Sequence, residues 1–244
     1  MNRPWPVPDK PWIMNQTWND LLFAHWPVDV AILRSIIPTS LPIDTYEGTA
    51  WLGVVPFHMT GVTPRGIPPL PYFSAFPEIN LRTYVTLSDK PGVFFFSLDA
   101  ENRFAVEAAR MAFHLSYFYA QIQIQQHGLQ ITDYISTRKD KRARQGIFSA
   151  AYKPASDIYL SVPGSLESWL TERYCLYSTD SKGTVYRGEI NHDTWPLQSA
   201  EAEIRINTLA SSFGMTLPDI PPLLHFAKEL HVKIWSLEKV DPMK

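Results

Sequence analysis

The chain has 244 residues, of which 45% are hydrophobic and 13% aromatic, with eight tryptophans. This composition supplies enough apolar surface for a large core and excludes a disordered protein. With 22 Lys and Arg against 24 Asp and Glu, the formal net charge is −2. The overall charge therefore gives no reason to expect nucleic acid or an anionic membrane as a partner.

Length and cysteine content indicate how the chain is organised. All-β sandwiches and barrels often reach this length as one unit, so we expect a single domain over residues 1–244. Cys175 is the only cysteine, which is typical of proteins in a reducing compartment. The first residues show no apolar signal segment, and no apolar run approaches the roughly 18 residues of a membrane span. We therefore expect a cytoplasmic protein.

The N-terminal third predicts a helix followed by a hairpin. Apolar residues at helical spacing favour a short helix over 29–37, stopped by Pro38. A strand, a turn at Glu47-Gly48 and a second strand are predicted over 43–57, and the second strand is apolar on both faces. Five prolines then predict an irregular loop over 63–77.

The rest of the chain predicts mostly short strands. A strand over 76–87 is followed by a strand, a helix of about ten residues and a strand between 92 and 124. A short helix begins at Ser165, and the sequence TDSKGT forms a hairpin turn. Further strands are predicted at 129–137, 146–153, 173–179, 184–191, 201–208 and 228–237. Such a chain predicts an α+β, mainly antiparallel architecture, curled or closed into a β-barrel with a few short helices.

Polar side chains alternate along the strand predicted over 76–87, and they fall on one face because successive side chains of a strand point to opposite sides. Such a strand either exposes its polar face to water or is buried on both faces, with the polar row lining a pocket. Similar rows containing Tyr117 and Arg173 favour the pocket. The residues of the first row are Glu78, Asn80, Arg82 and Tyr84.

A buried arginine needs a partner, because an isolated charge is costly in a low-dielectric site. Glu78 or Glu107 could pair with Arg82 or Arg110. An aromatic-walled cavity with one arginine and one carboxylate would suit a small apolar or aromatic molecule that carries a carbonyl or carboxylate group. The alternative is structural, namely a cross-strand salt bridge that holds the barrel in register.

Other features of the sequence point less clearly to a functional site. His192 and Trp195 end a predicted strand and could cap the same cavity, or His192 could simply close a loop hydrogen bond. The basic run RKDKRAR at 138–144 is interpreted as a solvated loop rather than a nucleic-acid contact. Phosphate-binding glycine loops, nucleophile elbows and zincin motifs are absent, and the seven histidines have no tight metal spacing. We expect neither a metal nor a cofactor.

Several segments resemble the YqjF-like uncharacterised bacterial family (DUF2071), which is grouped with the acetoacetate decarboxylase-like proteins. They are LLFAHWPV, GTAWLGVVPF, LRTYVTL…PGVFFFSLDA, PGSLESWLTERYCLY and RGEINHDTWPL, and the resemblance spans about residues 18–200. It implies an α+β fold around a cone-like antiparallel β-barrel with a small interior pocket, in which Glu78 is similar in placement to the decarboxylase's pocket glutamate.

The sequence departs from the decarboxylase at its reactive lysine. In that enzyme a lysine after the helix forms a Schiff base with the substrate ketone. Here no lysine occurs between Lys90 and Lys139, and EAARMAFHLSYFYA stands in that region. Arg110 keeps a positive charge but cannot form an imine. Decarboxylation through an imine is therefore not expected.

Two functions from different classes follow, beside a purely structural role. The first is a binding protein whose pocket holds a small molecule, without nucleic-acid or membrane partners and with a homo-oligomer allowed. The second is a lyase, hydrolase or isomerase in which Glu78 is the general base and Arg110 stabilises an enolate or oxyanion. The predicted ligand-binding residues are Asn80, Arg82, Tyr84, Tyr117, Arg173, His192 and Trp195.

Overall fold

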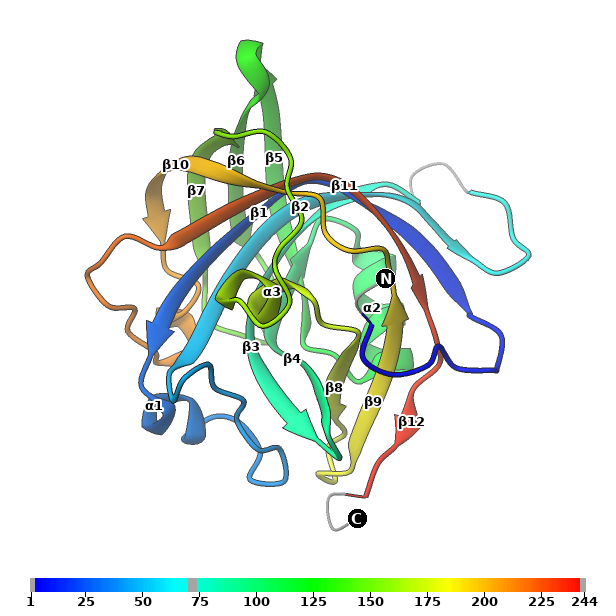
Figure 1. Cartoon of the computed structure of the whole chain (residues 1–244). Helices are drawn as coiled ribbons and strands as arrows, with labels where there is room; N and C mark the ends of the chain where they lie inside the picture. The colour runs from blue at the N-terminus through cyan, green and yellow to red at the C-terminus, as the bar shows by residue number, and fades with distance from the viewer. Residues whose placement is uncertain (1–2, 70–73, 242–244) are drawn as a thin grey trace.

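The computed structural model describes residues 3–69 and 74–241. Strands dominate and the helices are short (Figure 1). The strands are β1 (Met14–Val28), β2 (Ala50–Pro64), β3 (Phe76–Leu87), β4 (Lys90–Ala100), β5 (Tyr117–His127), β6 (Ile131–Arg138), β7 (Ile147–Pro154), β8 (Cys175–Thr179), β9 (Val185–Asn191), β10 (Leu197–Asn207), β11 (Leu223–Ile234) and β12 (Glu238–Lys239). The helices are α1 (Val30–Arg34), α2 (Arg103–Phe113) and α3 (Leu166–Thr171), with single 3₁₀ turns η1 (Gly128–Gln130) and η2 (Ser211–Phe213).

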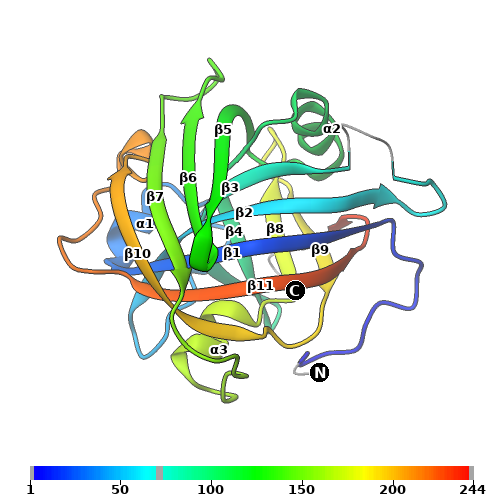
Figure 2. The ribbon, with the colours of Figure 1, turned by 90° about the horizontal axis from the view of Figure 1, so that it is seen from above.

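The sheet closes on itself twice. Pairing of β4 with β5 closes a nine-stranded mixed barrel, in the order β4-β3-β2-β1-β11-β10-β7-β6-β5, which we call the nine-stranded ring. Pairing of β9 with β11 closes a second ring through β8, in the order β4-β3-β2-β1-β11-β9-β8, which we call the seven-stranded ring. The two rings share β4, β3, β2, β1 and β11 as a common wall. Figure 2 shows β5, β6 and β7 running across the direction of β1, β2 and β11.

Two strands of the common wall branch between the rings. In β4 the residues around Val93 pair with β8, and those from Leu98 to Ala100 pair with β5, both in parallel. A parallel partner requires a crossover, and α2 supplies the one between β4 and β5. In β11 the residues around Ala227 pair with β10, whereas Ile234 pairs with β9. Gly92 permits the β4–β8 contact, because a Cβ there would lie 2.7 Å from Cys175 Sγ.

The predicted helix starts near Asp29 and at Ser165 are confirmed. Their side chains accept hydrogen bonds from first-turn backbone N–H groups of α1 and α3, as N-cap residues do. Asn102, which the sequence analysis did not single out, caps α2 in the same way. The turn at Glu47-Gly48 has positive φ angles of 49° and 82°, and the hairpin β8–β9 lies where TDSKGT predicts it. No helix in the described part of the chain is both long and apolar enough to cross a membrane.

The largest errors of the sequence prediction concern the first strands. No strand was predicted over Met14–Val28, although β1 lies within the common wall between β2 and β11. Asp20 has a φ of 47°, and the pairing with β2 changes register between Asn19 and Ala24. This irregularity breaks the alternation on which a strand prediction depends. The strand expected before Glu47 consists only of isolated bridges. Of the predicted loop over 63–77, residues 70–73 lie outside the described residues.

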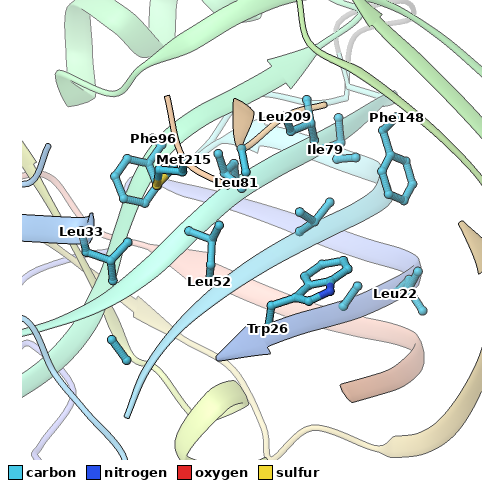
Figure 3. Packing of buried hydrophobic residues seen from close by; sticks show 14 of the residues in the cluster. Leu22, Trp26, Leu33, Leu52, Ile79, Leu81, Phe96, Phe148, Leu209 and Met215 are labelled. Carbon is cyan, nitrogen blue, oxygen red and sulfur yellow. The ribbon is translucent and has the colours of Figure 1, made fainter. Parts of the chain in front are cut away.

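The nine-stranded ring is filled by apolar side chains (Figure 3). Leu52, Ile79 and Leu81 of the common wall belong to the same buried cluster as Phe148 and Leu209. Burial of this kind contributes roughly 25 cal/mol per Å² of apolar surface. It is the main source of stability on this side of the wall.

One buried ion pair lies within this packed ring, and it corrects the interpretation of the basic run. Arg138 donates to both carboxylate oxygens of Asp99, at 2.7 and 2.9 Å, and both side chains are fully buried. Arg142 is partly exposed and pairs with Asp140 and Glu107. The run is therefore not simply a solvated loop, because its first arginine ends β6 with its side chain inside the protein.

Candidate functional site

A cavity of about 120 Å³ lies inside the seven-stranded ring. Its wall comes from the common wall, from β8 and β9 and from α2, and most of its lining residues are apolar. Seven of the nine predicted site residues line it, namely Glu78, Asn80, Arg82, Tyr117, Arg173, His192 and Trp195. Residues from segments nearly 120 positions apart in the sequence therefore meet at one site.

The polar row of β3 faces this cavity. Glu78, Asn80 and Arg82 are only 2%, 5% and 8% exposed. Ile79 and Leu81, which alternate with them, point to the other side of the wall and join the packed cluster of the nine-stranded ring. Of the two interpretations of this strand, burial on both faces is therefore the correct one.

Glu78 sits at one end of the row as a neutral acid. Burial raises its pKa to about 8, the hydrogen bond from Tyr117 opposes this rise, and the charge of Asp99 adds to it. The Tyr117 hydroxyl donates to Glu78 Oε2 at 2.9 Å. At neutral pH the carboxyl is mostly protonated, and a group with this pKa can both give and take a proton near neutrality.

Arg82 is a buried cation that makes no ion pair among the described residues. Its Nη2 donates to the Leu170 carbonyl at 3.3 Å and to the Tyr84 hydroxyl at 3.4 Å, and its Nε has no hydrogen-bond partner. Neither Glu78 nor Glu107 pairs with it, because Glu78 binds Tyr117 and Glu107 binds Arg142. The predicted cross-strand salt bridge is thus absent from the described structure.

Arg173 is the second cation of the cavity, and it is neutralised. Its Nη1 lies 2.6 Å from Asp44 Oδ2, its guanidinium lies 4.3 Å from the Trp169 ring centroid, and its Nη2 has no partner. Burial lowers its pKa, and the charge of Asp44 opposes this. Asp44 therefore balances the charge of Arg173 beside the cavity.

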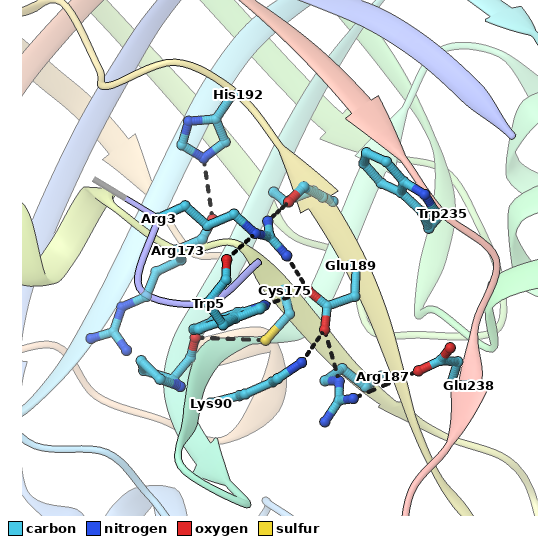
Figure 4. Close-up of polar contacts among 12 residues, drawn as sticks. Arg3, Trp5, Lys90, Arg173, Cys175, Arg187, Glu189, His192, Trp235 and Glu238 are labelled. Carbon is cyan, nitrogen blue, oxygen red and sulfur yellow. Dashed lines mark hydrogen bonds and ion pairs between the residues drawn. The ribbon is translucent and has the colours of Figure 1, made fainter. Parts of the chain in front are cut away.

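His192 and Trp195 line the cavity from the segment after β9. The His192 ring contacts the Asp193 carbonyl through Nδ1 at 2.7 Å. Its Nε2 contacts the Arg173 carbonyl at 3.2 Å (Figure 4). Burial lowers the pKa of His192. His192 therefore closes a contact within its loop and also lines the cavity. Trp195 Nε1 is buried without a partner.

Two predicted site residues do not line the cavity. The Tyr84 hydroxyl is bonded to His25 Nε2 at 2.7 Å and donates to the Leu170 carbonyl at 2.8 Å. It also accepts a hydrogen bond from Arg82 Nη2 and so helps to hold that guanidinium in place. Arg110 Nη1 donates to the Tyr117 carbonyl at 2.8 Å, and the guanidinium lies 5.6 Å from the Phe118 ring centroid. Of the two arginines considered as partners of a carboxylate, Arg82 therefore lines the cavity, and Arg110 braces α2 against β5.

Of the polar row predicted to begin at Tyr117, on β5, only the first residue faces the cavity. Tyr117 faces the cavity, but Gln121 and Gln123 are exposed on β5. Sequence reasoning also missed Gln16 and Trp18, which line the cavity from β1. Trp18 stacks on Trp195, with ring centroids 5.8 Å apart. Recognition of β1 as a strand would have provided the signal for both.

No lysine lines the cavity in the described structure. Lys90, the lysine that precedes the lysine-free region, binds Glu189 at 2.8 Å beside Arg3 and Trp5 (Figure 4). Burial alone would raise the pKa of Glu189, but hydrogen bonds and charges from these partners lower it. Lys90 therefore serves an ion-pair cluster at the end of the seven-stranded ring. No group of three His, Cys, Asp or Glu side chains suited to a metal occurs among the described residues.

The fold places the protein among the acetoacetate decarboxylase-like barrels. The enduracididine biosynthesis enzyme MppR has a TM-score of 0.67 at 10% identity, with 96% of this chain and 90% of that chain covered. An acetoacetate decarboxylase-like enzyme from Sphingomonas wittichii RW1 has a TM-score of 0.64 at 12% identity, with 95% and 94% covered. At these identities the likeness establishes the fold alone.

Sequence comparison identifies the family within this class. The profile of the family DUF2071, described as "Uncharacterized conserved protein", matches residues 15–231. "Uncharacterized protein YqjF" of Bacillus subtilis (strain 168) is 52% identical over 233 residues, which cover 96% of this chain and 95% of the relative. The chain belongs to this YqjF-like family.

Proposed function

We propose that the protein binds a small organic carboxylate, with a carbonyl group and an apolar body, in the cavity of the seven-stranded ring. The observation that carries this proposal is Arg82, a buried guanidinium without a counter-charge among the described residues. An unpaired buried charge is costly. A bound carboxylate would supply the missing negative charge through charge-assisted hydrogen bonds.

The other polar groups of the cavity agree with an anionic guest. Glu78 is mostly neutral at pH 7, and Arg173 is balanced by Asp44, so Arg82 leaves the lining with a positive charge. Donors without partners outnumber acceptors without partners among the lining residues. The donors are Trp18 Nε1, Arg82 Nε, Arg173 Nη2 and Trp195 Nε1, and the acceptor is Asn80 Oδ1. Buried polar groups normally have partners, and carboxylate and carbonyl oxygens would satisfy these donors.

A structure of the same fold offers a candidate probe. MppR has been solved in complex with pyruvate, and this structure has a TM-score of 0.64 and 10% identity to the chain, with 97% of this chain and 93% of that chain covered. Pyruvate is a carboxylate with an adjacent carbonyl, which is the chemistry that the unpartnered donors favour. This supports pyruvate as a first probe.

The test compares two arginine variants. We expect pyruvate or phenylpyruvate, titrated by calorimetry, to bind the wild type and to bind Arg82→Met at least about tenfold more weakly, because a hydrogen bond to a charged group contributes roughly 1.5–3 kcal/mol. Arg110→Met is the matched control, since this arginine lies outside the cavity lining, and it should bind like the wild type. Thermal melting checks that both variants fold. Equal loss in both variants, or no binding of either acid to the wild type, contradicts the proposal.

The state of Glu78 favours a second candidate function, an acid–base enzyme. With a pKa of about 8, its carboxylate form can take a proton from the carbon next to the ligand's carbonyl. The C–H bond breaks, the proton moves to Glu78, and the electron pair moves to the carbonyl oxygen as an enolate that Arg82 stabilises. No imine is needed.

Exchange of the methyl protons of pyruvate with deuterated solvent, followed by NMR, tests this second function. We expect the rate to rise with pH through about 8 as Glu78 ionises, and Glu78→Gln to lose exchange by about 100-fold or more while it still binds pyruvate. An unchanged rate in Glu78→Gln would leave only the binding function.

A further inference from the structure

A second hollow adjoins the cavity on the side of α2. It is a groove of about 370 Å³ between α2 and the outer ends of β1 and β2. Its lining includes Val62, Phe76 and Phe113 and is apolar except for Gln16 and Tyr117. Those two residues also line the cavity.

The two hollows meet along a shared border. Six residues line both of them, namely Met14, Gln16, Met59, Ala109, Phe113 and Tyr117. The polar end of the combined space is therefore at Arg82 and Glu78, and the apolar end is at α2. This polarity matches a molecule with an anionic head and an apolar tail.

Four of the six α2 residues that line the groove are alanines, and the other two are Phe104 and Phe113. Ala105, Ala108, Ala109 and Ala112 have the spacing of one helix face and all line the groove. A helix that packed directly on β1 and β2 would present larger apolar residues along such a face. Among the described residues, the small side chains leave space between α2 and the two strands.

Gln16 is the polar residue of β1 at the border between the two hollows. Its side chain is 9% exposed, and it lines both the cavity and the groove. A side-chain amide can both donate and accept hydrogen bonds. A polar atom of a ligand that passes from the cavity to the groove would come within reach of this amide.

Size favours the same conclusion. Ligand pockets usually enclose roughly 300–1,000 Å³, whereas the inner cavity encloses only about 120 Å³. The groove, at about 370 Å³, brings the joined space into the usual range. The inner cavity alone suits only a head group of a few atoms.

From the continuity of cavity and groove we infer that the ligand is an amphiphilic carboxylate, whose head lies at Arg82 and whose apolar chain passes Gln16 into the alanine-lined groove of α2. This inference rests on the proposed carboxylate binding and specifies the ligand class. Medium-chain or aryl-substituted 2-oxo acids fit this description, and pyruvate corresponds to the head group alone.

A chain-length series tests the inference. We expect the affinity of straight-chain 2-oxo acids, measured by calorimetry from pyruvate to 2-oxooctanoate, to rise roughly two- to fourfold with each added methylene. Ala108→Phe, which fills the groove, should abolish this rise and leave pyruvate affinity unchanged. Met111→Phe is the control, because Met111 is 75% exposed on α2 and does not line the groove. Ala112→Phe provides a second groove variant if Ala108→Phe does not melt cooperatively.

The outcomes separate this inference from the proposal on which it rests. Failure of every acid in the series to bind the wild type would overturn both. Pyruvate binding without a gain for longer acids would overturn the amphiphilic ligand and leave the carboxylate site. A gain that persists in both Ala108→Phe and Ala112→Phe would place the chain elsewhere and overturn the groove.

Discussion

The two rings of the barrel share five strands yet differ in what fills them. The nine-stranded ring is packed with apolar side chains, and the seven-stranded ring holds a cavity. Neighbouring residues of one strand face different rings. On β2, Val54 belongs to the packed cluster and Val55 lines the cavity. A single wall can therefore carry a stable core on one face and a site on the other, because side chains of a strand alternate.

The buried arginines show the same contrast. Arg138 in the nine-stranded ring is fully paired with Asp99, whereas Arg82 in the seven-stranded ring makes no ion pair among the described residues. Folding alone favours the first arrangement, because an unpaired buried charge lowers stability. Functional sites are where proteins retain such costly groups. The contrast places a stabilising ion pair in one ring and supports the binding site proposed in the other.

The largest expected effect is the pH dependence that Glu78 imposes from the cavity side. Its pKa is about 8 in the folded protein against an ordinary 4.5, so the folded state holds a proton that the unfolded chain releases between these pH values. The free energy of unfolding should therefore be largest below about pH 4.5, and it should fall by up to about 5 kcal/mol as the pH rises to about 8. Urea denaturation across this range should show the fall in the wild type and not in Glu78→Gln. Parallel pH profiles for the wild type and Glu78→Gln would contradict the raised pKa of Glu78.

Removal of the paired arginine should be nearly as damaging. Arg138→Met leaves Asp99 buried without its partner, and we expect the free energy of unfolding to drop by about 3–5 kcal/mol. Chemical denaturation measures this loss. A drop below about 1 kcal/mol would mean that the ion pair does not stabilise the nine-stranded ring.

Adjacent valines on β2 allow the packing inside the two rings to be compared directly. Val54→Leu adds bulk to a packed cluster and should cost about 1–3 kcal/mol, as overpacking does. Val55→Leu points the same added bulk into the cavity and should change stability by less than about 0.5 kcal/mol. Each variant controls for the other, since strand propensity changes equally. Equal losses would show that the seven-stranded ring is as tightly packed as its neighbour.

The smallest expected effect on stability is that of Arg82→Met. Because this substitution removes an unpaired buried charge, we expect the melting temperature to stay the same or to rise, with a gain of up to about 1 kcal/mol. This is opposite in sign to Arg138→Met. A loss comparable to that of Arg138→Met would show that Arg82 is structural and would weaken its role in binding.

Much of the architecture follows from local sequence signals. Asp29 and Ser165 start helices, and TDSKGT forms a hairpin, because capping and turn chemistry act within a few residues. β1 could not be recognised in this way. Its backbone bends at Asp20, and its residues are held by β2 and β11, which lie about 30 and 200 positions away in the sequence.

The candidate site was only partly readable for a related reason. Alternation on β3 predicts that Glu78, Asn80 and Arg82 share a face, and the structure confirms that this face is interior. It could not decide between Arg82 and Arg110 as the cation of the site, because that depends on where α2 docks. Nor could composition show that Arg138, within a basic run, would be buried against Asp99.

The sequence by itself determined the helix starts, the polar row of β3, the absence of lysine between Lys90 and Lys139 and the family. Only the tertiary structure decided that the sheet closes twice, which face of the common wall is hollow, and that Arg82 lacks a counter-charge among the described residues. The physical reason is that alternation and capping are properties of adjacent residues. Closure and charge pairing depend instead on contacts between segments far apart in the chain.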